Sequence, residues 1–157
     1  MKEKRKKIIQ ARSLYKIYDM GEEKVTALKN INLDIFAGEI CCIFGPSGSG
    51  KSTLLNQLAG LEKPTRGGVK ICGQIISRMN ENELAAFRQH HSGFIFQSYN
   101  LLNHLNALEN VALPLEFAGI EKTEREKAAR HMLGEVGLAG RMKHYPNLMS
   151  GGQQQRV

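Results

Sequence analysis

The stretch Gly45-Pro46-Ser47-Gly48-Ser49-Gly50-Lys51-Ser52-Thr53 decides the fold of this sequence. Its spacing fits the phosphate-binding loop pattern G-x-x-x-x-G-K-[ST]. Glycines allow the backbone to curl around a phosphate with its N–H groups pointing inward. In such a loop Lys51 provides a positive charge for the β- and γ-phosphates, and the Ser52 hydroxyl is a ligand for Mg²⁺. The sequence therefore predicts a binding site for a nucleoside triphosphate.

The residues on both sides of this loop predict the strand, loop and helix order in which the motif is meaningful. Ile40–Phe44 is a short apolar run, typical of a buried parallel strand. Thr53–Ala59 contains good helix formers, so a helix should open at the loop with the positive end of its dipole facing the phosphates. This context disfavours the alternative, a flexible Gly/Ser surface turn.

Composition favours one globular domain, because 41% of the 157 residues are apolar and no apolar run is long enough to span a membrane. The basic segment 1–7 has no secretory h-region after it, and we interpret it as a solvated tail. Attraction of this tail to an anionic membrane surface is the alternative. Much of the net charge of +7 lies there, so the remainder predicts no nucleic-acid surface.

The cysteines and histidines show no metal-ligand spacing. We expect the three cysteines to be small core residues of a reduced, cytosolic protein, and the five histidines to be surface or structural residues. These residues are Cys41, Cys42, Cys72, His90, His91, His104, His131, His144.

Strand patterns dominate the first part of the chain. Residues 8–44 read as strands joined by turns, with a largely alternating apolar pattern that ends at the turn Ala37-Gly38. Residues 67–76 predict two short strands around a turn at Gly73, and Gly93–Phe96 predicts a further buried strand. The alternating residues are Leu28, Ile31, Leu33 and Ile35.

Helix patterns follow. Asn80 and Glu83 predict a capping box that opens a helix through about Gln89. From about residue 106, Leu108, Val111, Leu115 and Ala118 form a helical stripe in which Pro114 predicts a kink. Thr123 and Glu126 predict a second capping box, and the core face of that helix would contain Ala128, Ala129, Met132, Leu133 and Val136.

A second phosphate-binding pattern closes the sequence at Ser150-Gly151-Gly152-Gln153. A serine and two glycines ahead of a helix offer a hydroxyl, backbone N–H groups and the helix dipole. One phosphate-loop domain has little use for two such ends on one nucleotide. Two copies that face each other could use both ends, because each copy would close this end over the γ-phosphate bound to the other copy. A plain helix cap is the alternative interpretation.

With these motifs together, the sequence resembles the ATP-binding subunits of ABC transporters over about residues 8–157. The phosphate loop resembles their Walker A motif, and Ser150–Gln153 resembles their signature motif. Gln97 resembles the Q-loop glutamine, which in that family touches Mg²⁺ and the attacking water and relays the nucleotide state to the membrane domain. Tyr18 stands where the family places the aromatic ring that stacks on adenine. The alternatives are a polar strand end for Gln97 and an ordinary sheet-edge tyrosine for Tyr18.

Three segments look most like the lipoprotein-release and macrolide-export type of ATPase, namely Tyr18–Glu23, Gly93–Gln97 and Ala107–Val111. Met149 stands where leucine usually precedes the signature serine, which is a volume-conserving change. The resemblance implies an α/β fold, with a P-loop NTPase core, an N-terminal antiparallel β subdomain and a helical insert. It implies a β subdomain and Walker A core at about 8–97, a helical subdomain at about 98–149, and the start of the signature helix at 150–157.

Family members continue with a Walker B strand that bears the Mg²⁺ aspartate and the catalytic glutamate, and these motifs do not occur in the 157 residues. The later strands that should cover Ile40–Phe44 do not occur either. We therefore expect the first two-thirds of an ATPase domain, an incomplete core that binds ATP through Lys51 and Ser52. A polypeptide of this sequence should hydrolyse ATP only at background rates.

The resemblance implies a motor subunit with Lys51 and Gln97 as catalytic residues and Ser52 and Gln97 as Mg²⁺ ligands. Two copies, as a homodimer or with a paired ATPase subunit, would bind ATP, close, and drive an integral membrane permease when hydrolysis reopens them. Such a subunit is cytoplasmic, lies at the inner face of the cell membrane and has no nucleic-acid partner. A soluble ABC-type ATPase and a cell-division-type relative without a transported substrate are the alternatives.

Overall fold

The structure is a computed structural model that describes residues 5–157 and divides into two compact units, Met1–Ser92 and Gly93–Val157. The first four residues of the basic N-terminal segment lie outside the described residues. In the described part of the chain, no helix combines the length and the apolar character needed to cross a bilayer. Each unit has its own hydrophobic core.

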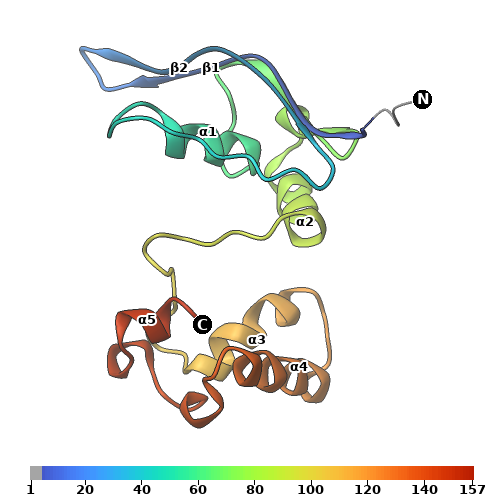
Figure 1. Cartoon of the computed structure of the whole chain (residues 1–157), viewed down its shortest axis with the longest axis vertical. Coiled ribbons are helices and arrows are strands. Elements are labelled where there is room, and N and C mark those ends of the chain that lie inside the picture. The colour runs from blue at the N-terminus through green and yellow to red at the C-terminus, as the bar shows by residue number, and fades with distance from the viewer. Residues whose placement is uncertain (1–4) are drawn as a thin grey trace. The chain divides into compact units, whose positions relative to one another are not determined.

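The first unit combines an antiparallel sheet with two α-helices (Figure 1). Its sheet has the strand order β2-β1-β3-β4, and the pairings are antiparallel. The expected antiparallel β subdomain is therefore confirmed. The elements are β1 (Lys7–Asp19), β2 (Lys24–Phe36), α1 (Lys51–Leu58), β3 (Arg66–Ile71), β4 (Gln74–Ile75), the 3-10 helix η1 (Ile76–Arg78) and α2 (Glu81–His91).

Two bulges in the long strands β1 and β2 let apolar side chains at uneven spacings point into the same core. Ala11 and Leu14 are three residues apart, so in a regular strand they would point to opposite faces. A register shift between them, with Ser13 at φ 44°, places both side chains in the core at 0% exposure. Asn30, at φ 52°, has the same effect between Leu28 and Ile31. Leu14 alone contributes about 2 kcal/mol by burial.

The extent of pairing changes along β1. Residues Ile9–Tyr15 pair with β3, whereas the ladder with β2 extends from Lys7 to Asp19. Beyond the β3 ladder, the hydroxyl oxygen of Thr65 accepts a hydrogen bond from the N–H of Ile17 at 3.0 Å. The C-terminal end of β1 is therefore attached mainly to β2.

The prediction of a buried strand at Ile40–Phe44 is wrong for this structure. The segment has no regular secondary structure, and Ile40 and Phe44 are 92% and 89% exposed. The physical reason is that a strand needs a backbone partner, and in residues 5–157 no strand pairs with this segment. The cysteine prediction fails with it, because Cys41, Cys42 and Cys72 are all exposed.

Local signals elsewhere in the first unit are confirmed. Strands β3 and β4 meet at a turn around Gly73. Asn80 caps α2 as predicted, since its side chain accepts from the Glu83 N–H at 2.9 Å and the Glu83 carboxylate accepts from the Asn80 N–H at 2.7 Å. The helix ends two residues later than predicted, at His91.

The second unit consists of short helices, among which α3 and α4 lie side by side (Figure 1). Its core contains Ala107, Leu133, Leu138 and Met149. The elements are α3 (Ala107–Phe117), α4 (Lys122–Glu135), the 3-10 helices η2 (Ala139–Arg141) and η3 (Pro146–Leu148), and α5 (Gly151–Gln154).

Three expectations for this unit need correction. Residues Gly93–Phe96 form no strand, and Ile95 is 87% exposed, because no described strand lies beside them to accept their hydrogen bonds. Thr123 does not cap α4, since the helix begins one residue earlier, at Lys122, and has no side-chain cap. Ala128 and Met132 were expected in the core but are exposed, because the buried stripe of α4 runs through Ala129 and Leu133.

Candidate functional site

The predicted phosphate loop leads directly into α1, and the start of this helix has no side-chain cap. The first turn of a helix leaves backbone N–H groups without carbonyl partners. In α2 and α3 a capping box satisfies part of this set through Asn80 and Asn106. In α1 the N-cap is Gly50 and the first turn contains no acidic residue. The N–H groups of the first turn of α1 and the positive end of its dipole therefore remain available for an anion.

Gly50 shows why the glycine of the pattern is needed here. Its φ of 86° lies in the left-handed region, which side chains disfavour. A Cβ on Gly50 would also lie 2.5 Å from the backbone oxygen of Ala27 on β2. The loop can approach the sheet this closely only with a residue that has no side chain.

The side chain of Lys51 folds back across the phosphate loop. Its ammonium donates to the carbonyl oxygens of Gly45 at 2.9 Å and Pro46 at 2.7 Å, and it lies 3.4 Å from Ser49 Oγ. These contacts hold a positive charge at the centre of the loop. Ser52 is exposed beside it and offers a hard hydroxyl oxygen, the kind of ligand that Mg²⁺ prefers.

Tyr18 lies beside the end of this loop, although it is far from the loop in the sequence. Its hydroxyl oxygen is 3.5 Å from Thr53 Oγ1, although the two residues are 35 positions apart. The same hydroxyl donates to Glu62 Oε2 at 2.9 Å. The ammonium of Lys16 lies 5.1 Å from the centre of the Tyr18 ring. Lys16 and Glu62 were not predicted as site residues, because neither belongs to a recognisable motif.

The other predicted site residues, Gln97 and Ser150–Gln153, belong to the second unit. Gln97 is exposed and begins a turn. The Ser150 hydroxyl oxygen accepts from the Gln153 N–H at 3.4 Å, and Gln153 Oε1 accepts from the Ser150 N–H at 3.0 Å. This capping box opens the four-residue helix α5 and occupies one acceptor position of the Ser150 hydroxyl.

Tyr99 connects the Gln97 turn with the residues at the start of α5. A Cβ on Gly151 would lie 3.0 Å from the Tyr99 hydroxyl oxygen. Tyr99 has a φ of 61° and Asn100 a φ of 56°, so the chain after Gln97 turns sharply. Tyr99 was not predicted from the sequence, where the tendency of asparagine to adopt positive φ, at Asn100, was the one available signal.

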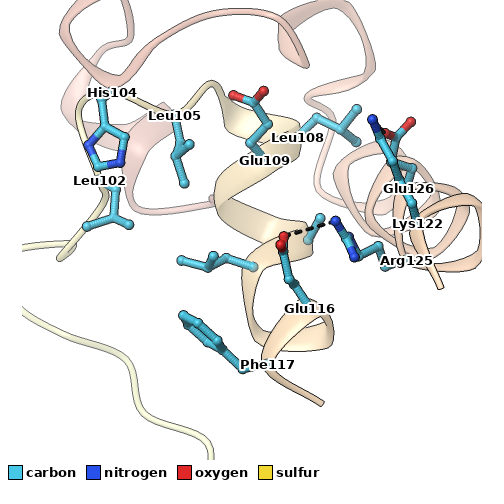
Figure 2. Close-up of a pocket in the computed structure, with 12 residues that line it drawn as sticks. Leu102, His104, Leu105, Leu108, Glu109, Glu116, Phe117, Lys122, Arg125 and Glu126 are labelled. Atoms are coloured by element: carbon cyan, nitrogen blue, oxygen red, sulfur yellow. Dashed lines mark ion pairs between the residues drawn. The ribbon is translucent and has the colours of Figure 1, made fainter. Parts of the chain in front are cut away.

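A cavity of about 430 Å³ lies in the second unit along α3 and the start of α4 (Figure 2). Arg125 and Glu116 form an ion pair of 3.0 Å at its wall, and Phe117 is 77% exposed at its rim. No predicted site residue lines this cavity. Within residues 5–157, no cluster of His, Cys, Asp or Glu side chains has the arrangement of a metal site.

The similar structures show the same fold at high sequence identity. The dimeric structure of a post-hydrolysis state of the ATP-binding cassette MJ0796, bound to ADP and Pi, matches 95% of this chain with a TM-score of 0.89 and 45% identity. A second dimeric structure of MJ0796 has the same TM-score at 46% identity. The chain covers 66% of each of those chains. The α/β fold of an ATP-binding cassette is therefore established for this chain.

Similar sequences agree with the structures. An uncharacterized ABC transporter ATP-binding protein from Thermotoga maritima is 52% identical over 152 residues, which are 97% of this chain and 65% of that protein. The macrolide export ATP-binding/permease protein MacB of Shewanella sp. is 48% identical over 152 residues, and the chain spans 23% of its length. The sequence profile of the ABC transporter family matches residues 28–157. The chain thus belongs to the ABC transporter family, as an ATP-binding cassette that spans about two-thirds of the length of the Thermotoga maritima protein and of the MJ0796 chain.

Proposed function

We propose that this chain forms the nucleotide-binding part of a transporter motor and that residues 45–53 hold the phosphates of ATP. The observation that carries this proposal is the uncapped start of α1, with the Lys51 ammonium held across the loop and Tyr18 beside Thr53. These groups match the two ends of one nucleotide, because N–H groups and a lysine suit phosphates and an aromatic ring suits a base.

Magnesium fits this donor set. The Ser52 hydroxyl would hold it from the loop, while most of its coordination would come from phosphates and water. When bound, the ion would neutralise charge that develops on the phosphate oxygens. We also propose that Lys51 and Gln97 are catalytic residues for hydrolysis, Lys51 at the phosphates and Gln97 at the attacking water. General-base chemistry would need a carboxylate that the 157 residues do not supply by motif.

Residues Ser150–Gln153 would contact the nucleotide of a second cassette. The capping box leaves the hydroxyl proton of Ser150 and the N–H groups of Gly151 and Gly152 for such a contact. The similar MJ0796 structures are described as dimeric, which supports a paired arrangement for this chain as well. Movement of the pair would drive an integral membrane partner, as the name ATP-binding/permease of MacB suggests. Binding to such a partner would place the cassette at the inner face of the cell membrane.

The proposal is tested by calorimetric titration of ATP into the Lys51→Ala protein. Loss of the ammonium should reduce ATP affinity by at least tenfold, because a charge-assisted contact to phosphate is lost. Lys70→Ala, a change at an exposed lysine of β3, is the matched control and should leave affinity unchanged. Equal affinities of the two variants would refute the assigned role of the loop. Purification with an integral membrane protein, rather than with ribosomes or DNA, would support the transport assignment.

A further inference from the structure

We infer that Glu62 and Lys16 are positioning residues for Tyr18 and fix its ring as the platform on which the adenine base stacks. This inference rests on the proposed function, because it assumes that ATP is the ligand of residues 45–53. It adds two residues from outside the recognised motifs to the site. It also gives each of them a distinct contact on the ring.

The hydroxyl of Tyr18 is fixed by Glu62. It donates to Glu62 Oε2 at 2.9 Å, and a hydrogen bond to a carboxylate is stronger than one between neutral groups. The side chain of Glu62 is 26% exposed, so water competes only in part for this carboxylate. One end of the ring is thereby anchored to the segment that follows α1.

Lys16 fixes both the carboxylate and one face of the ring. Its ammonium is 2.7 Å from Glu62 Oε1 and donates to the carbonyl oxygen of Lys63 at 3.0 Å. It also lies 5.1 Å from the centre of the Tyr18 ring, within the range of a cation–π contact. With a side-chain exposure of 15%, this charge is well shielded from solvent. Because one face carries the cation, a base would stack on the opposite face.

The same network is attached to the phosphate-loop helix. The Gln57 side chain, 1% exposed on α1, donates to the Lys63 carbonyl oxygen at 3.2 Å, so two donors share this acceptor. The Tyr18 hydroxyl oxygen also lies 3.5 Å from Thr53 Oγ1. The ring therefore has a fixed place relative to the start of α1. Fixing a binding group in advance increases affinity, because less freedom is lost on binding.

Titration of ATP and of inorganic tripolyphosphate separates the ring from the loop. Tyr18→Ala should weaken ATP binding about five- to a hundredfold, since one base–aromatic stack is lost, while tripolyphosphate affinity stays within twofold. Tyr18→Phe and Glu62→Gln should each weaken ATP binding about three- to tenfold, with tripolyphosphate affinity unchanged. The Tyr18→Phe/Glu62→Gln double variant should weaken ATP binding by less than the product of the two single effects, because both changes act on the same hydrogen bond.

The control is Glu81→Gln, which removes an exposed carboxylate that pairs with Lys63 at 3.3 Å. Its ATP affinity should equal that of the unmodified protein. If Tyr18→Phe and Glu62→Gln leave ATP affinity unchanged while Tyr18→Ala lowers it, the positioning role is wrong and the base contact stands. If Glu62→Gln weakens ATP and tripolyphosphate equally, Glu62 acts on the loop and the inference fails. If Tyr18→Ala has no effect, the base contact itself is refuted.

Discussion

The phenolic oxygen of Tyr99 lies so close to Gly151 that a methyl group on that glycine would be 3.0 Å away. This contact joins the turn that follows Gln97 to the first residue of α5. Tyr99 was not expected at this position. The contact gives Gly151 a packing reason to be glycine, whereas Gly152 has nothing within 4 Å of its missing side chain.

Alanine at these two neighbouring glycines should therefore have different effects on stability. Gly152→Ala should be neutral or stabilising by up to about 1 kcal/mol, because alanine loses less backbone entropy in a helix. Gly151→Ala should be less stable than Gly152→Ala by about 1 kcal/mol, because Tyr99 must shift. Chemical denaturation measures both free energies of unfolding. Adding Tyr99→Phe should remove the difference, and equal stabilities without it would contradict the predicted contact.

The capping residues provide a second prediction. Asn80→Ala and Asn106→Ala should each lower the free energy of unfolding by about 1 kcal/mol, because each removes an acceptor for the N–H at position N3. Thr123→Ala should change it by less than about 0.5 kcal/mol, since Thr123 does not cap α4. Thermal or urea unfolding compares the three variants. A cost at Thr123 similar to that at Asn106 would indicate a different start of α4 in solution.

Asp34 should make the stability of the sheet depend on acid pH. Hydrogen bonds from Lys7 and then Arg12 lower the pKa of Asp34 below its ordinary value of 3.8. Because the folded pKa is the lower one, this stabilisation is fully present above pH ~4, the unfolded value. It is lost as the pH falls further through the folded pKa.

Melting temperatures of the unmodified protein and Asp34→Asn, measured between pH 7 and pH 3, test this dependence. The variant should melt at a lower temperature at pH 7, and the two curves should converge below pH ~4. Added salt should narrow the difference at pH 7, because these charges are near the surface. A constant difference across the whole pH range would exclude the ionised carboxylate as its cause.

Local rules predicted much of this molecule correctly. The capping pair Asn80 and Glu83 needs only four residues to form, and the fixed spacing from Gly45 to Ser52 predicted where α1 begins. The turn at Gly73 between β3 and β4 was likewise predicted from the glycine itself. Such features depend on neighbours in the chain, so they can be read from the sequence.

Features that depend on distant partners could not be predicted in this way. Ile40–Phe44 has the composition of a buried strand, but strand formation depends on a paired backbone rather than on composition. The contact of Glu62 with Tyr18 joins residues 44 positions apart, and glutamate at a helix exit carries no local signal. Tyr99 reaches Gly151 only through a turn with two positive φ angles, a conformation that its sequence barely indicates.

The unequal pairing of β1 has a consequence for its dynamics. Amide protons of Ile9–Tyr15 lie within ladders to β2 and β3, so they should exchange with solvent slowly. Lys16–Asp19 belong only to the ladder with β2, and their other contacts are side-chain hydrogen bonds with Glu62, Lys63 and Thr65. The part of β1 that would meet a nucleotide is thus held on one side by the β2 ladder and on the other by side chains rather than by a second ladder. Ligand-dependent protection from hydrogen exchange should then be concentrated at Lys16–Asp19, while the rest of the strand exchanges as before.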